Sequence, residues 1–93
     1  MAETNRQQKK EELIRLLART TDPGDIAALL EDMCTVKEVE NMAERLFTAR
    51  LLLEGRTYSQ ILAQADISSA TLSRVSRCVQ LGRGYSRLLK ENE

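Results

Sequence analysis

The segment that most constrains the fold is residues 57–77, TYSQILAQADISSATLSRVSR. Thr57 followed by Gln60 starts a capping box, in which the hydroxyl accepts a helix N–H and the amide side chain reaches back to the cap. Ser68 and Ser69 are residue types that cap the start of a second helix. Five apolar residues are spaced to form one small core between the two helices: Ile61, Ala65, Ile67, Leu72 and Val75. This pattern predicts a helix-turn-helix.

Two positions in the turn region depart from the common form of this motif. Glycine often stands where Asp66 stands, because the backbone there is left-handed, and Asp tolerates that conformation better than most residues. We therefore expect Asp66 to be left-handed. Leu62 replaces a small residue, so we expect the two helices to pack slightly more openly. Gly55, just before the motif, suits a left-handed end of the preceding helix.

The outward face of the second helix is small, hydroxyl-bearing and basic. It consists of Ser69, Ala70, Thr71, Ser73, Arg74 and Arg77. Small residues permit close approach to the major groove of DNA, and hydroxyls and arginines bind bases and phosphates. An ordinary helical hairpin with a polar face is the alternative.

The charge of the chain is unevenly distributed, although its net charge is zero. Residues 1–35 carry five basic and seven acidic groups, residues 36–55 three and four, and residues 56–93 six and three, giving −2, −1 and +3. No acid occurs in residues 68–90, which hold five basic groups. A positive end on a neutral chain favours nucleic-acid binding, with a solvated basic surface as the alternative.

Composition weighs against an enzyme. The 93 residues suffice for one domain, and the absence of His excludes a His-dependent triad or a histidine metal site. Cys34 and Cys78 fit no metal spacing, and no phosphate-binding glycine loop is present. We expect no catalytic residue, metal or cofactor. We also expect no membrane partner and a cytoplasmic location with reduced thiols, because no apolar span or export signal is visible.

Capping signals divide the chain into six helices and no strand, an all-α fold. The helices expected before the motif are 5–19 with Thr4 as the cap, 23–33 with Asp22 as the cap and Pro23 at its first position, and 36–54 with a capping box at Thr35 and Glu38. We assign 1–55 to dimerisation, 56–82 to the helix-turn-helix and 83–93 to a C-terminal helix, in which Tyr85, Leu88 and Leu89 face one way.

The long helix predicted at 36–54 has an apolar face wider than one packing partner needs. One stripe includes Met42 and Leu46, and a second stripe beside it includes Phe47 and Leu51. The width favours a second subunit over a central helix buried in a monomer.

Segments 30–61 and 68–89, with cap, long helix and ATLSRVSRC at matching spacings, resemble the Trp repressor superfamily, most closely its YerC/YecD branch. The resemblance implies an intertwined homodimer that binds operator DNA and represses transcription. It also implies an effector slot lined by Arg45 and Arg74, with Cys78 where the Trp repressor has a serine. Arg74 alternatively holds only a phosphate, and Arg45 alternatively pairs with an acid across the dimer.

We therefore predict a sequence-specific transcriptional repressor that binds a palindromic double-stranded operator as a homodimer. The predicted DNA contacts are phosphate contacts by Arg74, Arg77, Arg83 and Arg87 and base contacts by Ser69, Ala70, Thr71 and Ser73, with Ser68 at the start of the helix. We expect tryptophan to be dispensable, because Leu52, Leu53 and Leu81 are large enough to fill the slot. The alternative function is a helical protein-interaction module with no DNA target.

Overall fold

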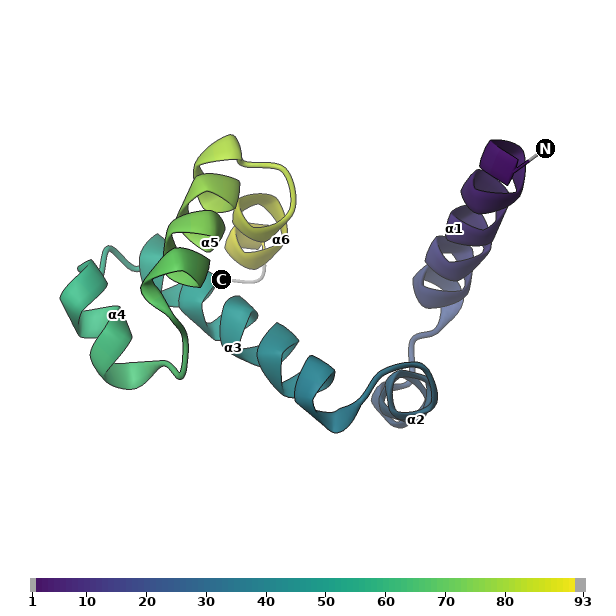
Figure 1. Ribbon diagram of the computed structural model, residues 1–93, viewed down its shortest axis with the longest axis horizontal. Coiled ribbons are helices and arrows are strands. Elements are labelled where there is room, and N and C mark those ends of the chain that lie inside the picture. Colours follow the sequence, from purple (N-terminus) through teal and green to yellow (C-terminus); the bar gives the residue numbers. More distant parts are fainter. Residues whose placement is uncertain (1, 92–93) are drawn as a thin grey trace. The chain divides into compact units, whose positions relative to one another are not determined.

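The computed structural model describes the backbone of residues 2–91 and the side chains of residues 5–90. Within that range the chain forms six helices and no strand (Figure 1). The helices are α1 (Ala2–Arg19), α2 (Pro23–Met33), α3 (Val36–Leu53), α4 (Tyr58–Gln64), α5 (Ser69–Leu81) and α6 (Tyr85–Glu91). The predicted all-α, six-helix fold is confirmed. None of these helices is both long and apolar enough to cross a membrane.

The chain divides into two compact units, Met1–Val36 and Lys37–Glu93. In the N-terminal unit, the Asp22 carboxylate accepts the Asp25 N–H at 3.0 Å, and Pro23 takes the first helical position, as predicted. Helix α1 begins at Ala2, so the predicted start at Asn5 was wrong. Thr4 therefore lies within the helix instead of capping it, and its side chain is outside the described residues.

Residues 5–36 form no core of their own, since none of their side chains is buried in the single chain. Apolar residues that should line an inner face remain open: Ile14 is 59% exposed, Met33 51% and Val36 78%. The apolar stripes of α1 and α2 are present, but this unit does not cover them.

Helix α3 begins directly after Thr35, as predicted, and ends one residue before the predicted Glu54. Gly55 is left-handed (φ 86°), and its N–H donates to the Leu52 carbonyl at 3.0 Å while the Arg56 N–H donates to the Leu51 carbonyl at 3.1 Å. This is a Schellman motif, in which only glycine takes the left-handed position without strain. The capping box expected at Thr35 and Glu38 stays a prediction.

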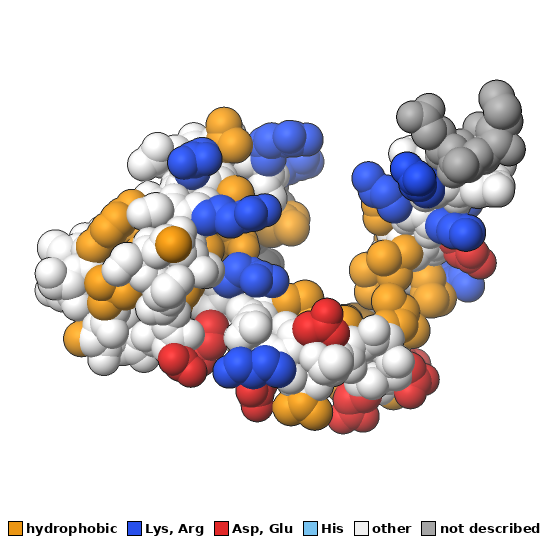
Figure 2. Space-filling view, viewed as in Figure 1, with side chains coloured by type: hydrophobic (Ala, Val, Ile, Leu, Met, Phe, Trp, Pro, Cys, Tyr) orange, Lys and Arg blue, Asp and Glu red, His pale blue; other side chains and the backbone are white. Residues whose placement is uncertain are grey.

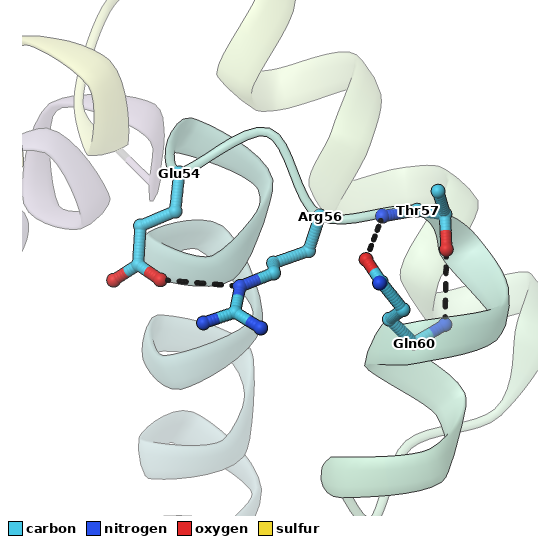
Figure 3. Close-up of polar contacts among 4 residues, drawn as sticks. All are labelled: Glu54, Arg56, Thr57 and Gln60. Atoms are coloured by element: carbon cyan, nitrogen blue, oxygen red, sulfur yellow. Dashed lines mark hydrogen bonds and ion pairs between the residues drawn. The ribbon is translucent and has the colours of Figure 1, made fainter.

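The short link between α3 and α4, residues 54–57, is held by hydrogen bonds and an ion pair (Figure 3). The Gln60 N–H donates to the Thr57 hydroxyl at 3.2 Å, and the Thr57 N–H donates to the Gln60 side-chain carbonyl at 2.9 Å. The predicted capping box is therefore confirmed. Arg56 and Glu54 form an ion pair at 3.5 Å beside it, but both are nearly half-exposed, so it adds little stability.

Two apolar clusters hold the helix-turn-helix against its neighbours. One contains Leu51, Ile61, Ala65 and Leu72, and the other contains Ala49, Val75 and Leu89. Ile67 and Leu52 pack against both clusters. The five predicted core residues are thus inward-facing, but the expectation of one core was wrong, because Val75 packs on α3 and α6.

Two further apolar predictions need correction. Leu62 is 41% exposed and requires no extra room between the helices, so the more open packing expected there is not needed. Leu88 is 60% exposed, whereas Leu89 is buried and Tyr85 is half-buried. The three residues of α6 therefore do not share one packed face in the single chain.

The turn between α4 and α5 is also built differently from the expectation. Among the described residues, no non-glycine residue has a positive φ, so Asp66 is not left-handed. The chain leaves α4 through Ala65 in an extended conformation (φ −106°, ψ 143°). The Asp66 N–H then donates to a carboxylate oxygen of Glu44 on α3 at 3.0 Å. This long-range bond satisfies the turn backbone without a left-handed residue.

Among the described residues, three hydroxyl-bearing side chains are buried in the C-terminal unit: Thr48, Ser76 and Ser86. The Ser86 hydroxyl donates to the Val79 carbonyl and so ties α6 to α5. Thr48 is completely buried in α3, and its hydroxyl has no hydrogen-bond partner among the described residues. An unpaired buried hydroxyl costs stability.

Candidate nucleic-acid interface

Helix α5 has a buried inner face and an exposed outer face. Leu72 and Val75 are 0% and 1% exposed, and they anchor the helix to both clusters. The outward face of α5 contains Ser69, Ala70, Ser73, Arg74 and Arg77, which are all exposed. Five of the six predicted outer residues of α5 thus form one accessible stripe.

The sixth residue, Thr71, belongs partly to the N-terminal cap of the helix. It is half-buried, its N–H donates to the Ser68 hydroxyl at 3.1 Å, and the Ser68 hydroxyl donates to the Thr71 hydroxyl at 3.0 Å. The hydroxyl hydrogen of Thr71 is left to donate to another acceptor. Thr71 and Ser68 therefore mark the edge of the stripe.

Basic side chains extend this surface beyond α5. Arg83, Arg87 and Lys90 are exposed, in addition to Arg74 and Arg77. Figure 2 shows most of the blue side chains of the C-terminal unit gathered over α5 and α6, whereas the red side chains on the same face lie toward α3, with a further blue side chain among them. The predicted local positive surface is therefore present on these two helices. Its field attracts phosphates even though the chain is neutral overall.

Two of the three residues predicted to line the effector slot, Arg45 and Cys78, line different depressions of the C-terminal unit. Arg45 lines a polar cleft of about 170 Å³ together with Asn41 and Thr71. Cys78 lines a shallow depression of about 730 Å³ with Leu81 and residues around the start of α6. Arg74 lines neither of these two. These two depressions hold only Arg45 and Cys78 of the three residues, and the effector slot stays a prediction.

Leu81 also differs from the expectation. It is 66% exposed, so it does not fill a slot in the single chain. Leu52 and Leu53, by contrast, are half-buried and pack against the cluster around Val75.

Sequence reasoning overlooked Glu44 as a residue near this interface. Its carboxylate lies in the same polar cleft as Arg45 and bonds the turn before α5. The partner is a backbone N–H that lies 22 residues away in the chain, and no residue type signals such a contact. Only the fold could reveal it.

The chain is all-helical and contains a helix-turn-helix whose second helix exposes a hydroxyl-bearing and basic face. These features are typical of DNA-binding regulators. The model of the Trp repressor protein family matches residues 8–93, and the chain belongs to this family. The predicted superfamily is confirmed, and it is a family of regulators rather than of enzymes.

Individual relatives agree with this assignment. The YerC protein of Bacillus subtilis strain 168, which is itself uncharacterized, is 36% identical over 72 residues, covering 77% of this chain and 69% of that protein. This similarity confirms the YerC-like branch.

Solved structures share the fold. A TrpR-like protein from Eubacterium eligens superimposes with a TM-score of 0.84 at 33% identity, covering 90% of this chain and 88% of that chain. A candidate Trp repressor from Staphylococcus aureus gives the same TM-score of 0.84 at 29% identity, covering 90% and 85%.

Proposed function

We propose that this protein is a sequence-specific transcriptional repressor that binds a palindromic double-stranded operator as a homodimer. The observation that carries the proposal is the outward stripe of α5, which is accessible along its length and free of acids. We therefore call α5 the recognition helix. Its small residues allow the backbone to approach base edges in the major groove.

Contacts divide by chemistry into two groups. The guanidinium groups of Arg74, Arg77, Arg83 and Arg87 hold phosphates and supply most of the affinity. Ser69, Ala70, Thr71 and Ser73 read base edges, and Ser68 lies where the recognition helix begins. Phosphate contacts fix the register of the protein, and base contacts give its preference for sequence.

The homodimer is supported by apolar surface that one chain leaves open. No side chain in residues 5–36 is buried, and Met42, Leu46 and Phe47 on α3 are 37%, 47% and 42% exposed. Met42 and Leu46 lie four residues apart on one face of α3, and an exposed apolar helix face of this kind marks an interaction site. A second copy of the chain covers it in the proposed assembly, in which residues 1–55 dimerise, residues 56–82 bind DNA and residues 83–93 close the C-terminal end.

We further propose that DNA binding does not require tryptophan. An amino acid effector needs an acceptor for its ammonium group, and the thiol of Cys78 is a much weaker partner than a serine hydroxyl.

The first test selects bound duplexes from a random DNA pool. We expect a palindromic sequence to be enriched, and we expect its affinity to fall steeply as salt rises, because several phosphate contacts release counterions. A pool that yields no preferred sequence, together with salt-insensitive capture of a protein partner, would favour the protein-interaction module.

The second test measures tryptophan binding by calorimetry, with DNA affinity measured in its presence and absence. We expect no binding at micromolar tryptophan and an unchanged affinity for the selected duplex. Micromolar binding that raises DNA affinity about tenfold, a coupling of about 1.4 kcal/mol, would restore tryptophan as the co-repressor.

A further inference from the structure

The turn that precedes the recognition helix is held from outside the motif. Glu44, in the middle of α3, accepts the Asp66 N–H at 3.0 Å. Both residues belong to the C-terminal unit, so the contact lies within one compact body. It is a side-chain bond that joins α3 directly to the backbone between α4 and α5.

A left-handed residue would restrict the backbone of the turn, and the turn has none. The hydrogen bond from Asp66 to Glu44 supplies a restriction in its place. In the described chain only Gly55 and Gly82 have positive φ, and the turn therefore contains no left-handed residue. Ala65 is extended, and the extended region allows a broad range of φ and ψ angles. The hydrogen bond from the Asp66 N–H to Glu44 narrows the range of backbone angles at this point. It therefore fixes where α5 begins.

The position of Glu44 adds a second constraint. Glu44 and its neighbour Arg45 line one small cleft together with Ser68, the N-cap of the recognition helix, and Thr71 in its first turn. The contact therefore lies three residues before Ser69, the first residue assigned to base contacts. A shift of the turn would displace those residues together.

We propose that Glu44 is a positioning residue of the recognition helix: its carboxylate holds the Asp66 peptide and so sets the placement of α5 on α3. The role in recognition rests on the proposed function. Since α3 also carries the face assigned to the dimer, this bond links the spacing of the two recognition helices to the assembly.

The charge of Glu44 and its hydrogen bond have opposite effects on DNA binding. A carboxylate close to DNA repels phosphates, so its removal alone should raise the affinity for every sequence. The hydrogen bond, by contrast, benefits only a protein that must present base-reading side chains accurately. Glutamine separates the two effects, because its side-chain carbonyl accepts the same N–H without the charge.

The experiment compares three full-length variants with the wild type. Glu44→Ala removes the charge and the bond, Glu44→Gln removes only the charge, and Glu40→Ala is the matched control. Glu40 is an exposed acid one turn earlier on α3. The probes are the duplex selected by the wild type and a scrambled duplex of the same length and composition. Circular dichroism checks that each variant is folded.

We expect Glu44→Ala to lose about three- to tenfold in affinity for the selected duplex relative to the scrambled one, up to about 1.4 kcal/mol, since the bond is exposed to solvent. Glu44→Gln and Glu40→Ala should keep the wild-type ratio. Equal losses on both duplexes, or a Glu44→Gln ratio as low as that of Glu44→Ala, would overturn the proposal.

Amide hydrogen exchange at Asp66 tests the contact without DNA. Exchange should be faster in Glu44→Ala than in Glu44→Gln or the wild type, and equal rates in all three would overturn the proposal. A wild-type protein that binds both duplexes equally would instead contradict the proposed function, and with it the role of Glu44 in recognition. The exchange rates would still report the contact itself, so the two failures are distinguishable.

Discussion

Leu46→Asp is the most direct perturbation of the proposed dimer. Leu46 lies in the middle of α3 and is 47% exposed in the single chain, between Met42 at 37% and Phe47 at 42%. In a monomer the substitution would place a carboxylate where water already reaches. In the dimer it would bury that carboxylate against an apolar face.

The magnitude follows from the exposed fraction. Complete burial of a leucine side chain contributes about 1.5–3 kcal/mol, and about half of this side chain is left for a second copy to cover. The lost transfer term is therefore about 0.7–1.5 kcal/mol per subunit, or about 1.5–3 kcal/mol for the two copies. Each unpaired buried carboxylate adds several kcal/mol. The dissociation constant of the dimer should rise at least about 1,000-fold, equivalent to about 4 kcal/mol.

Sedimentation equilibrium over a range of protein concentrations measures this change, and circular dichroism follows helix content in the same samples. The control is Leu62→Asp on α4, where the leucine has a similar exposure of 41% but lies outside the proposed interface. The control should remain a dimer with wild-type helix content. Leu46→Asp should lose its dimer and much of its helix together, because residues 5–36 have no buried side chains of their own.

Two results would refute the reasoning. A wild type that sediments as a well-folded monomer would remove the dimer altogether. A Leu46→Asp protein that dimerises as tightly as Leu62→Asp would show that the α3 face is not the interface.

The remaining predictions concern stability and recognition. Thr48→Val removes an unpaired buried hydroxyl at nearly constant shape and should raise the free energy of unfolding by about 1 kcal/mol. Thermal melts at fixed protein concentration measure this change, and a variant less stable than the wild type would show that the hydroxyl has a partner. Thr57→Ala removes the confirmed cap of α4 and should cost about 1 kcal/mol in the same melts, with Thr57→Ser close to the wild type. Arg77→Ala should weaken binding to all duplexes alike and reduce the slope of log affinity against log salt by about 1, while Ser73→Ala should relax the preference at one base pair per half-site by about 1–3 kcal/mol. Equal effects of these two substitutions on selected and random DNA would show that the α5 face is wrongly assigned.

Most helix ends were predictable from the sequence because they depend on neighbouring residues. Asp22 with Pro23, and Thr57 with Gln60, satisfy helix N–H groups within three residues, so the sequence alone specifies these caps. Gly55 ended its helix as expected for the same reason. The outward stripe of α5 followed from helical periodicity together with the anchoring residues Leu72 and Val75.

Features that depend on distant contacts were not predictable in this way. The conformation of Asp66 depends on Glu44, which lies 22 residues earlier in the chain. Thr48 lies one turn after the charged residues Glu44 and Arg45 and looks solvent-facing by position and residue type, yet it is completely buried. Leu88 matched the period of α6, but the single chain leaves it exposed, since period alone does not show which face meets a neighbour.

The lack of buried side chains in residues 5–36 bears on how the protein is made. These residues leave the ribosome first, before any of the clusters that involve α3 to α6 have been synthesised. An isolated helix as short as α2, which has 11 residues, is marginal in water, and a region without buried side chains is open to proteases until it is covered. If a second chain provides that cover, completion of folding is a bimolecular step whose rate rises with the local concentration of nascent protein. Translation of many copies from one messenger RNA would then favour assembly, and slow expression would leave more of the protein open to degradation.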